Sequence, residues 1–257
     1  MIEIRPLTTM KELQQLQEVE AAVWDMAPIP VHQTFTVLNH GGVILGAFDG
    51  DKMVGFLNSF PGFAEGKVYL CSHMLGILPE YRKSGLGRDM KNKQAEVARN
   101  TGYDLITWTF DPLESLNAFF NIQKLKAKGV AYKENHYGAM DDDLNQGLPT
   151  DRIQIEWDLH EQNNDRNVHF EKESILLDKD GHGQPTMFAH RYEQKAGPWF
   201  LAVPENFQTI KQEDFQRARE WRYQTRKVFQ TLFNDGYQAK GVIRGQESQT
   251  SYYMLER

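Results

Sequence analysis

The residues with the clearest chemical potential lie in one short run, Arg82-Lys-Ser-Gly-Leu-Gly-Arg88. Its two glycines can adopt backbone conformations that other residues avoid, so successive backbone N–H groups can turn toward one point. Free N–H groups at the start of a helix, the positive end of the helix dipole and nearby basic side chains together bind anionic groups. The run therefore predicts a turn that binds a pyrophosphate.

The glycines alone leave other interpretations open, since many strand-to-helix turns use glycine only for its backbone freedom. The dinucleotide-binding pattern fails, because Met90 stands where its third glycine belongs. The phosphate loop of nucleotide triphosphatases also fails, because the run contains no Gly-Lys-Ser or Gly-Lys-Thr. A nucleotide-phosphate binder of another fold is therefore the weakest of the hypotheses.

The elements on either side of the run would position it. Val68 to Leu78 is a long apolar stretch rich in strand formers and ended by a proline, which predicts a buried strand. The residues up to Asn100 predict a helix, followed by Thr101-Gly102 as a stop. The apolar stripe of that helix consists of Leu86, Met90, Val97 and Ala98.

In Arg82-x-x-Gly85-x-Gly87, directly after a strand ending in Ile77-Leu-Pro-Glu-Tyr81, the sequence resembles the GNAT acyltransferase superfamily. The signature of that superfamily is Arg/Gln-x-x-Gly-x-Gly/Ala, and its loop holds the pyrophosphate of an acyl-coenzyme A. The resemblance implies an acetyl-CoA or other short-chain acyl-CoA as co-substrate and no metal. The coenzyme-binding residues that it implies are Leu75, Gly76, Ile77, Arg82, Lys83, Ser84, Gly85, Leu86, Gly87, Arg88 and Asn117.

A second part of the chain looks like a little-characterised branch of the same superfamily. It includes Phe110-Asp-Pro-Leu-Glu-Ser-Leu-Asn117, Asn135-His-Tyr-Gly138 and the stretch from Asn145 to Trp157. The fold class that we expect is α/β with a mixed sheet: a GNAT acyltransferase domain at residues 1–159 and a smaller α+β region at residues 168–257. The most polar stretch, His160 to Asn167, is interpreted as the linker between them.

Local patterns predict the remaining elements. Ile2 to Leu7 reads as an edge strand, and Thr9-Met-Lys-Glu12 as a capping box that opens a helix. Asp49-Gly-Asp-Lys52 is a hairpin turn between two strands. After the strand Asp104–Phe110, Asp111 and Pro112 predict a helix start, with Leu113, Leu116, Phe120 and Leu125 on its apolar face.

The C-terminal region predicts a second set of elements. Asp178 to Pro185 is interpreted as a hairpin turn and not a calcium loop, because the closing Glu is missing. Glu213 to Asp235 predicts a long amphipathic helix, which follows a strand at Trp199–Val203 and precedes strands at Tyr237–Ile243 and Ser251–Leu255. This order repeats the one from Leu105 to Leu159. It indicates either a degenerate GNAT-like half or a common arrangement that arose independently.

His73 and Tyr137 are the candidate catalytic residues. His73 lies two residues before Leu75, and an imidazole suits proton transfer near neutral pH. Direct transfer without a covalent intermediate is usual in the superfamily, so a Cys71–His73 nucleophile pair is the lesser alternative. Leu125 stands near the position of the tyrosine that often serves as general acid there, and Tyr137 is the best substitute in this chain.

The net charge, the cysteine count and the lack of long apolar stretches limit the class of protein that this chain can be. The chain has 257 residues, a net charge of −6 and one cysteine. The acidic balance argues against a nucleic-acid scaffold, and the single cysteine fits a reducing compartment. The N-terminus lacks the pattern of a signal peptide and no stretch is apolar enough to span a bilayer, so we expect a cytoplasmic monomer or homodimer.

Two functional hypotheses follow from these patterns. The first is an acyl-CoA-dependent N-acyltransferase that acts on the amine of a small molecule. The second is a sensor or structural protein that binds acyl-CoA without catalysis, which the missing helix tyrosine would explain.

Overall fold

The computed structural model describes residues 2–24, 27–82, 84–140, 145, 147–161, 168–192, 197–245 and 249–257. Lys83 and most of the predicted linker lie outside the described residues. The chain forms two compact units. Unit 1 contains residues 1–108 and 158–161, and unit 2 contains residues 109–157 and 162–257.

Unit 1 is built around a mixed sheet whose strands follow the order of the sequence. The strands are β1 (Glu3–Pro6), β2 (Val43–Asp49), β3 (Lys52–Ala64), β4 (Lys67–Ile77) and β5 (Leu105–Phe110), of which the last two residues belong to unit 2. Neighbouring strands are antiparallel except β4 and β5, which are parallel. The turn between β2 and β3 confirms the predicted hairpin at Asp49–Lys52.

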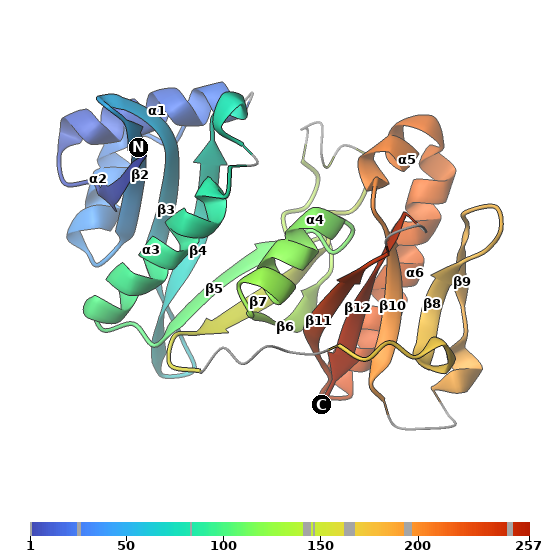
Figure 1. The fold of residues 1–257 in the computed structure, drawn as a ribbon. Helices are drawn as coiled ribbons and strands as arrows, with labels where there is room; N and C mark the ends of the chain where they lie inside the picture. Colours follow the sequence, from blue (N-terminus) through green and yellow to red (C-terminus); the bar gives the residue numbers. More distant parts are fainter. Residues whose placement is uncertain are drawn as a thin grey trace. The chain divides into compact units, whose positions relative to one another are not determined.

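Helices cover both faces of this sheet (Figure 1). They are α1 (Met10–Val23), α2 (Val31–Asn39) and α3 (Leu86–Asn100), with a short 3-10 helix η1 (Pro79–Tyr81) before α3. The capping box predicted at the start of α1 is present, since Thr9 and Glu12 each bond to the backbone of the other. Six of the seven residues of β2 are buried, as expected for a strand with both faces covered.

The strands of unit 2 follow one another in the order β7-β6-β11-β12-β10-β8-β9. Its strands are β6 (Lys128–Lys133), β7 (Arg152–Asp158), β8 (Ile175–Lys179), β9 (Pro185–Met187), β10 (Trp199–Pro204), β11 (Gln238–Arg244) and β12 (Thr250–Glu256). Its helices are α4 (Ser115–Ala118), the π-helix η2 (Phe119–Lys124), η3 (Lys172–Ser174), η4 (Ala189–Arg191), α5 (Phe207–Glu213) and α6 (Phe215–Asn234).

Several predictions for unit 2 are confirmed. The long amphipathic helix is α6, and β8 and β9 form an antiparallel hairpin around the Asp178–Pro185 segment. The helix predicted to start at Asp111 begins only at Ser115, although the Asp111 carboxylate accepts a bond from the backbone N–H of Leu113. Leu116, expected on its apolar face, is 62% exposed.

The compact units differ from the predicted domains, because residues 109–157 pack with the C-terminal elements. The sequence Ala-Lys-Gly-Val occurs at residues 127–130 and again at 239–242. β6, which contains the last three residues of the first copy, and β11, which contains the second copy, are adjacent and antiparallel, with Gly129 opposite Ala239. Whether residues 168–257 are a degenerate GNAT-like half or a common arrangement stays open. That residues 1–159 form one functional domain stays a prediction.

Buried ion pairs tie α6 to the rest of unit 2. Arg226 donates from Nε and Nη2 to the two carboxylate oxygens of Asp151, each at 2.8 Å, and Asp151 is fully buried. One turn earlier, Nη1 of Arg222 donates to Asp111 at 3.0 Å. A buried carboxylate that loses its cation is strongly destabilising, by about 3–5 kcal/mol.

A chain shortened to end at Asp158 should therefore be less soluble and less heat-stable than the full chain. It keeps every predicted coenzyme-binding residue but leaves Asp111 and Asp151 without Arg222 and Arg226. Thermal unfolding and size-exclusion chromatography of both chains measure the difference. If the shortened chain is monomeric, equally heat-stable and equally active, α6 does not stabilise residues 109–157.

Candidate functional site

The turn before α3 has the geometry expected of an anion-binding turn. Gly85 is the N-cap of α3 and has φ +89°, in the left-handed region that favours glycine. No atom lies within 4 Å of the position that a Cβ on Gly85 would occupy. Among the described residues, the backbone N–H groups of Gly85 and Gly87 have no hydrogen-bond partner. Two donors at a helix N-terminus thus remain available to a ligand.

Side chains of the turn hold its backbone in place. Ser84 Oγ donates to the carbonyl of Tyr81 at 2.8 Å, and Arg82 Nε donates to the carbonyl of Ile77 at 3.0 Å. The hydroxyl of Tyr81 donates to Asp49 in the β2–β3 hairpin at 2.9 Å. These bonds fix the turn to the end of β4 and to the neighbouring hairpin. The Arg82 guanidinium is exposed and can still reach an anionic ligand.

Strand β4 has an irregular register at His73. Asn58 of β3 pairs with Met74, but the next residue, Ser59, pairs with Ser72. His73 therefore has no residue opposite it and forms a β-bulge. Bulges often occur next to active sites, where they change the direction of a side chain.

The parallel pairing of β4 with β5 is short. Within the described residues it covers only Leu70 with Ile106 and Cys71 with Thr107. The bulge follows two residues later, and Leu75, Gly76 and Ile77 lie between the bulge and the turn. A Cβ on Gly76 would lie 2.5 Å from the ring of Phe56, so this position requires glycine for packing.

His73 is exposed, and its ring lies 5.6 Å from the ring of Phe60. The groups around the imidazole keep part of the bulk water away, and this desolvation lowers the pKa of His73 from its ordinary value of 6.5. The side chain is then neutral at physiological pH and able to accept a proton. Burial raises the pKa of Cys71, which disfavours the thiolate that nucleophilic catalysis would need.

The sequence did not reveal a buried polar cluster that lies beside this strand. Lys91 of α3 is 4% exposed, and its Nζ donates to Ser72 Oγ at 2.8 Å. The same Nζ lies 3.8 Å from the ring centroid of Trp108 on β5. Ser72 Oγ in turn donates to Gln94 Oε1 at 3.3 Å. Desolvation lowers the pKa of Lys91 from 10.5 to about 7.

A buried lysine has no distinctive signal in the sequence of a helix. Lys91 follows Met90 at the edge of the apolar stripe, where a long side chain can equally well extend into solvent. Only the register of β4 and β5 places Ser72 and Trp108 on the face toward α3.

Two predicted residues belong to unit 2. Asn117 is exposed on α4. Tyr137 lies in the turn between β6 and β7 and is 50% exposed, and its hydroxyl lies 3.0 Å from Oγ1 of Thr109 at the end of β5. The backbone N–H of Tyr137 donates to Thr150 Oγ1 at 3.0 Å. The phenol is therefore held in one position and remains open to solvent.

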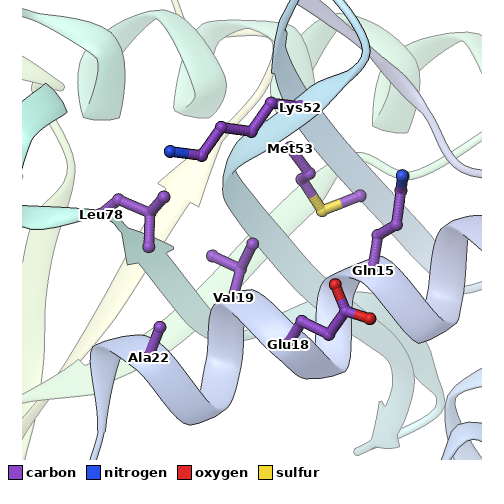
Figure 2. Close-up of a pocket in the computed structure, with 7 residues that line it drawn as sticks. All are labelled: Gln15, Glu18, Val19, Ala22, Lys52, Met53 and Leu78. Carbon is purple, nitrogen blue, oxygen red and sulfur yellow. The ribbon is translucent and has the colours of Figure 1, made fainter.

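A groove of about 250 Å³ also lies in unit 1, between α1 and the β2–β3 hairpin (Figure 2). It contains none of the predicted site residues, although Leu78 at its edge directly follows β4. Its lining residues are Gln15, Glu18, Val19, Ala22, Lys52, Met53 and Leu78. Among the described residues, no group of three His, Cys, Asp or Glu side chains could hold a metal ion.

Comparison with known proteins identifies the domain that contains this site. Residues 8–121 match the profile of the Acetyltransferase (GNAT) family. Residues 8–121 form a GNAT acetyltransferase domain. The match includes β4, the turn and α3, so the predicted fold class and the predicted resemblance to the GNAT family are confirmed for these residues. A comparison with curated protein sequences found no match.

Two solved structures have the GNAT fold in common with this chain. The ribosomal-protein-S18-alanine N-acetyltransferase from Escherichia coli is 15% identical, with a TM-score of 0.50 over 66% of this chain and 100% of that one. The protein smu.2055 from Streptococcus mutans UA159 is 17% identical, with a TM-score of 0.51 over 62% of this chain and 99% of that one. At these identities the likeness shows the fold.

The GNAT domain indicates an N-acetyltransferase that depends on an acyl-CoA. The turn fits the coenzyme, because the N–H groups of Gly85 and Gly87 are available and the space beside Gly85 is open. Among the described residues, no helix has the length and apolar character that crossing a membrane requires. The cytoplasmic location stays a prediction.

The low pKa of Lys91 predicts a pH dependence of stability. Between about pH 7 and pH 10.5 the unfolded chain holds a proton on Lys91 that the folded chain lacks, so stability rises with pH by at most about 1.4 kcal/mol per pH unit. Denaturant unfolding at pH 7, 8 and 9 should show this rise in the wild type relative to Lys91→Met.

The comparison with Lys91→Met removes the contribution of Cys71, whose raised pKa has the opposite sign. Lys93→Met is the matched control, because Lys93 lies on the same helix and pairs with Glu96 at the surface. If the free energy of unfolding changes equally with pH in the wild type and in Lys91→Met, Lys91 does not have the lowered pKa that burial without a counter-ion produces.

Proposed function

We propose that this protein transfers a short acyl group from an acyl-CoA to the amine of a small molecule by direct attack. The observation that carries the proposal is the turn at Gly85, which leaves N–H groups free at the start of α3 directly after the bulged strand β4. Such a turn holds the pyrophosphate of the coenzyme. The acyl-CoA itself supplies the activated thioester.

The donor would lie along the end of β4. In this arrangement the turn from Arg82 to Arg88 holds the pyrophosphate, and the backbone of Leu75 to Ile77 aligns the pantetheine and donates to the thioester carbonyl. A donor at this place stabilises the negative charge that develops on the carbonyl oxygen. The family resemblance adds Asn117 as a further proposed contact to the coenzyme.

The attacking amine must be neutral, and His73 is the proposed base. Its pKa is lowered by desolvation, so it is unprotonated at the pH where an amine must lose a proton. Its position in the bulge and its exposure allow it to reach a ligand or an ordered water. The departing thiolate needs a proton in return, and the exposed phenol of Tyr137 is the proposed source.

The non-catalytic sensor is the second candidate, favoured by the absence of a tyrosine at Leu125, which is buried. Coenzyme A release from acetyl-CoA in the presence of a panel of small amines separates the two functions. A transferase releases coenzyme A only when its acceptor is present. A protein that binds acetyl-CoA but releases none with any amine in the panel would favour the sensor.

Replacing Gly85 with valine should lower acetyl-CoA affinity at least tenfold. A β-branched residue resists φ +89°, at a cost of about 1–2 kcal/mol, and relaxation of this angle would turn the N–H groups away from the pyrophosphate. Isothermal titration calorimetry with acetyl-CoA measures the effect.

Gly102→Val is the matched control for this change. Gly102 follows the other end of α3, has φ +91° and also has open space around its Cβ position. The two variants bear the same backbone strain, so both should lose stability but only Gly85→Val should lose affinity. An unchanged affinity in folded Gly85→Val would refute the pyrophosphate assignment.

Replacing His73 with glutamine should change the pH profile of the transferase. In the wild type the rate should fall on the acidic side as the imidazole takes up a proton, with a midpoint below the ordinary histidine pKa of 6.5. Glutamine does not titrate, so the variant should have a lower rate and no such acidic limb. A variant with the wild-type rate and profile would remove His73 from the mechanism.

A further inference from the structure

The cluster around Lys91 has more hydrogen-bond donors than acceptors. Ser72 Oγ accepts from Lys91 and donates to Gln94 Oε1. Gln94 is fully buried, and its Nε2 has no partner. A buried donor without a partner costs about 1–3 kcal/mol and requires an explanation, such as a ligand or a bound water.

No carboxylate balances the lysine. Among the described residues, the only titratable neighbour with an electrostatic effect on Lys91 is Cys71 of β4. The groups that contact its Nζ are the hydroxyl of Ser72 on β4 and the ring of Trp108 on β5. The groups that contact Lys91 and Gln94 thus offer no acceptor for Gln94 Nε2 and no counter-ion for Lys91, and an anionic oxygen of a ligand would supply both.

The cluster lies where β4 and β5 cease to pair. Cys71 and Thr107 form the last pair of these strands in the described part of the chain, and Ser72 and Trp108 are the next residue of each strand. Along β4 the order is Ser72, the bulge at His73, Leu75 to Ile77, and then the pyrophosphate turn. In the proposed function the pantetheine follows Leu75 to Ile77, so its acyl end points along β4 toward Ser72.

We propose that the Lys91–Ser72–Gln94 cluster recognises an acyl group that ends in a carboxylate, and that the acyl donor is a short dicarboxylic acyl-CoA. This inference rests on the proposed function, because it requires an acyl-CoA bound along β4. The carboxylate accepts hydrogen bonds from Lys91 Nζ and Gln94 Nε2. Lys91 acts here as a specificity residue for the donor and takes no part in the bond changes.

Binding of malonyl-CoA and propionyl-CoA tests the proposal without knowledge of the acceptor. The two acyl groups have the same number of carbons, and one ends in a carboxylate where the other ends in a methyl group. Calorimetry with the wild type should give at least tenfold tighter binding of malonyl-CoA, and Lys91→Met should lose this preference. Lys93→Met, which changes a partly exposed lysine of α3 that pairs with Glu96, should keep it.

Proton uptake provides a readout that a purely structural role of Lys91 would not change. A carboxylate beside Lys91 favours its charged form, so malonyl-CoA binding at pH 8 should take up a proton. The measured enthalpy should then vary with the ionisation enthalpy of the buffer in the wild type, and not in Lys91→Met. Propionyl-CoA should show no such variation.

The outcomes separate this inference from the proposed function. Equal affinity of the wild type for the two donors, or a preference that survives in folded Lys91→Met, overturns the inference alone. If the wild type does not bind coenzyme A itself, the proposed function fails, and the inference fails with it. Gln94→Leu is the second variant, and it should weaken malonyl-CoA binding while it leaves propionyl-CoA binding unchanged.

Discussion

The left-handed backbone of Gly85 is the constraint on which the rest of the site depends. It reverses the chain between β4 and α3, leaves two N–H groups free for an anion, and sets the direction in which α3 runs back along the sheet. Because α3 starts at Leu86, Lys91 comes about one and a half turns later, on the side that faces Ser72. One dihedral angle thus determines both the anion-binding turn and the position of the buried lysine.

Buried basic side chains have different partners in the two units. In unit 2, Arg222 and Arg226 each have a carboxylate partner, and the pairs join α6 to residues 109–157. Charges of this kind are compensated, and their role is structural. In unit 1, Lys91 has no carboxylate among the described residues. A buried lysine without a counter-ion destabilises a fold and gives up its proton more readily, so its presence is better explained by a ligand than by packing.

The sequence predicted what depends on neighbouring residues. The capping box at Thr9, the hairpin at Asp49–Lys52 and the amphipathic helix α6 are local, and the structure contains all three. The start of the helix after Asp111 was wrong: the Asp111 carboxylate bonds both to the backbone N–H of Leu113 and to the distant Arg222, and the helix begins only at Ser115. The π-helical continuation of α4 has no local signal either.

Functional residues, too, could be predicted where they depend on neighbouring residues and not where they depend on strand pairing. The turn from Arg82 to Arg88 could be predicted because its chemistry resides in its own backbone and glycines. The bulge at His73 and the cluster at Lys91 could not, because both depend on how β4 pairs with β3 and β5. A polar residue in a helix becomes a candidate only after the pairing shows that it faces the sheet.

Desolvation lowers the pKa of both His73 and Lys91, yet their surroundings suit them to different tasks. His73 is exposed in a bulge, so its proton can pass to and from a ligand or water. Lys91 is buried against Ser72 and Trp108, so its charged form is suited to hold an anion. Exposure, more than pKa, therefore decides which of two neutral bases transfers protons and which one recognises charge.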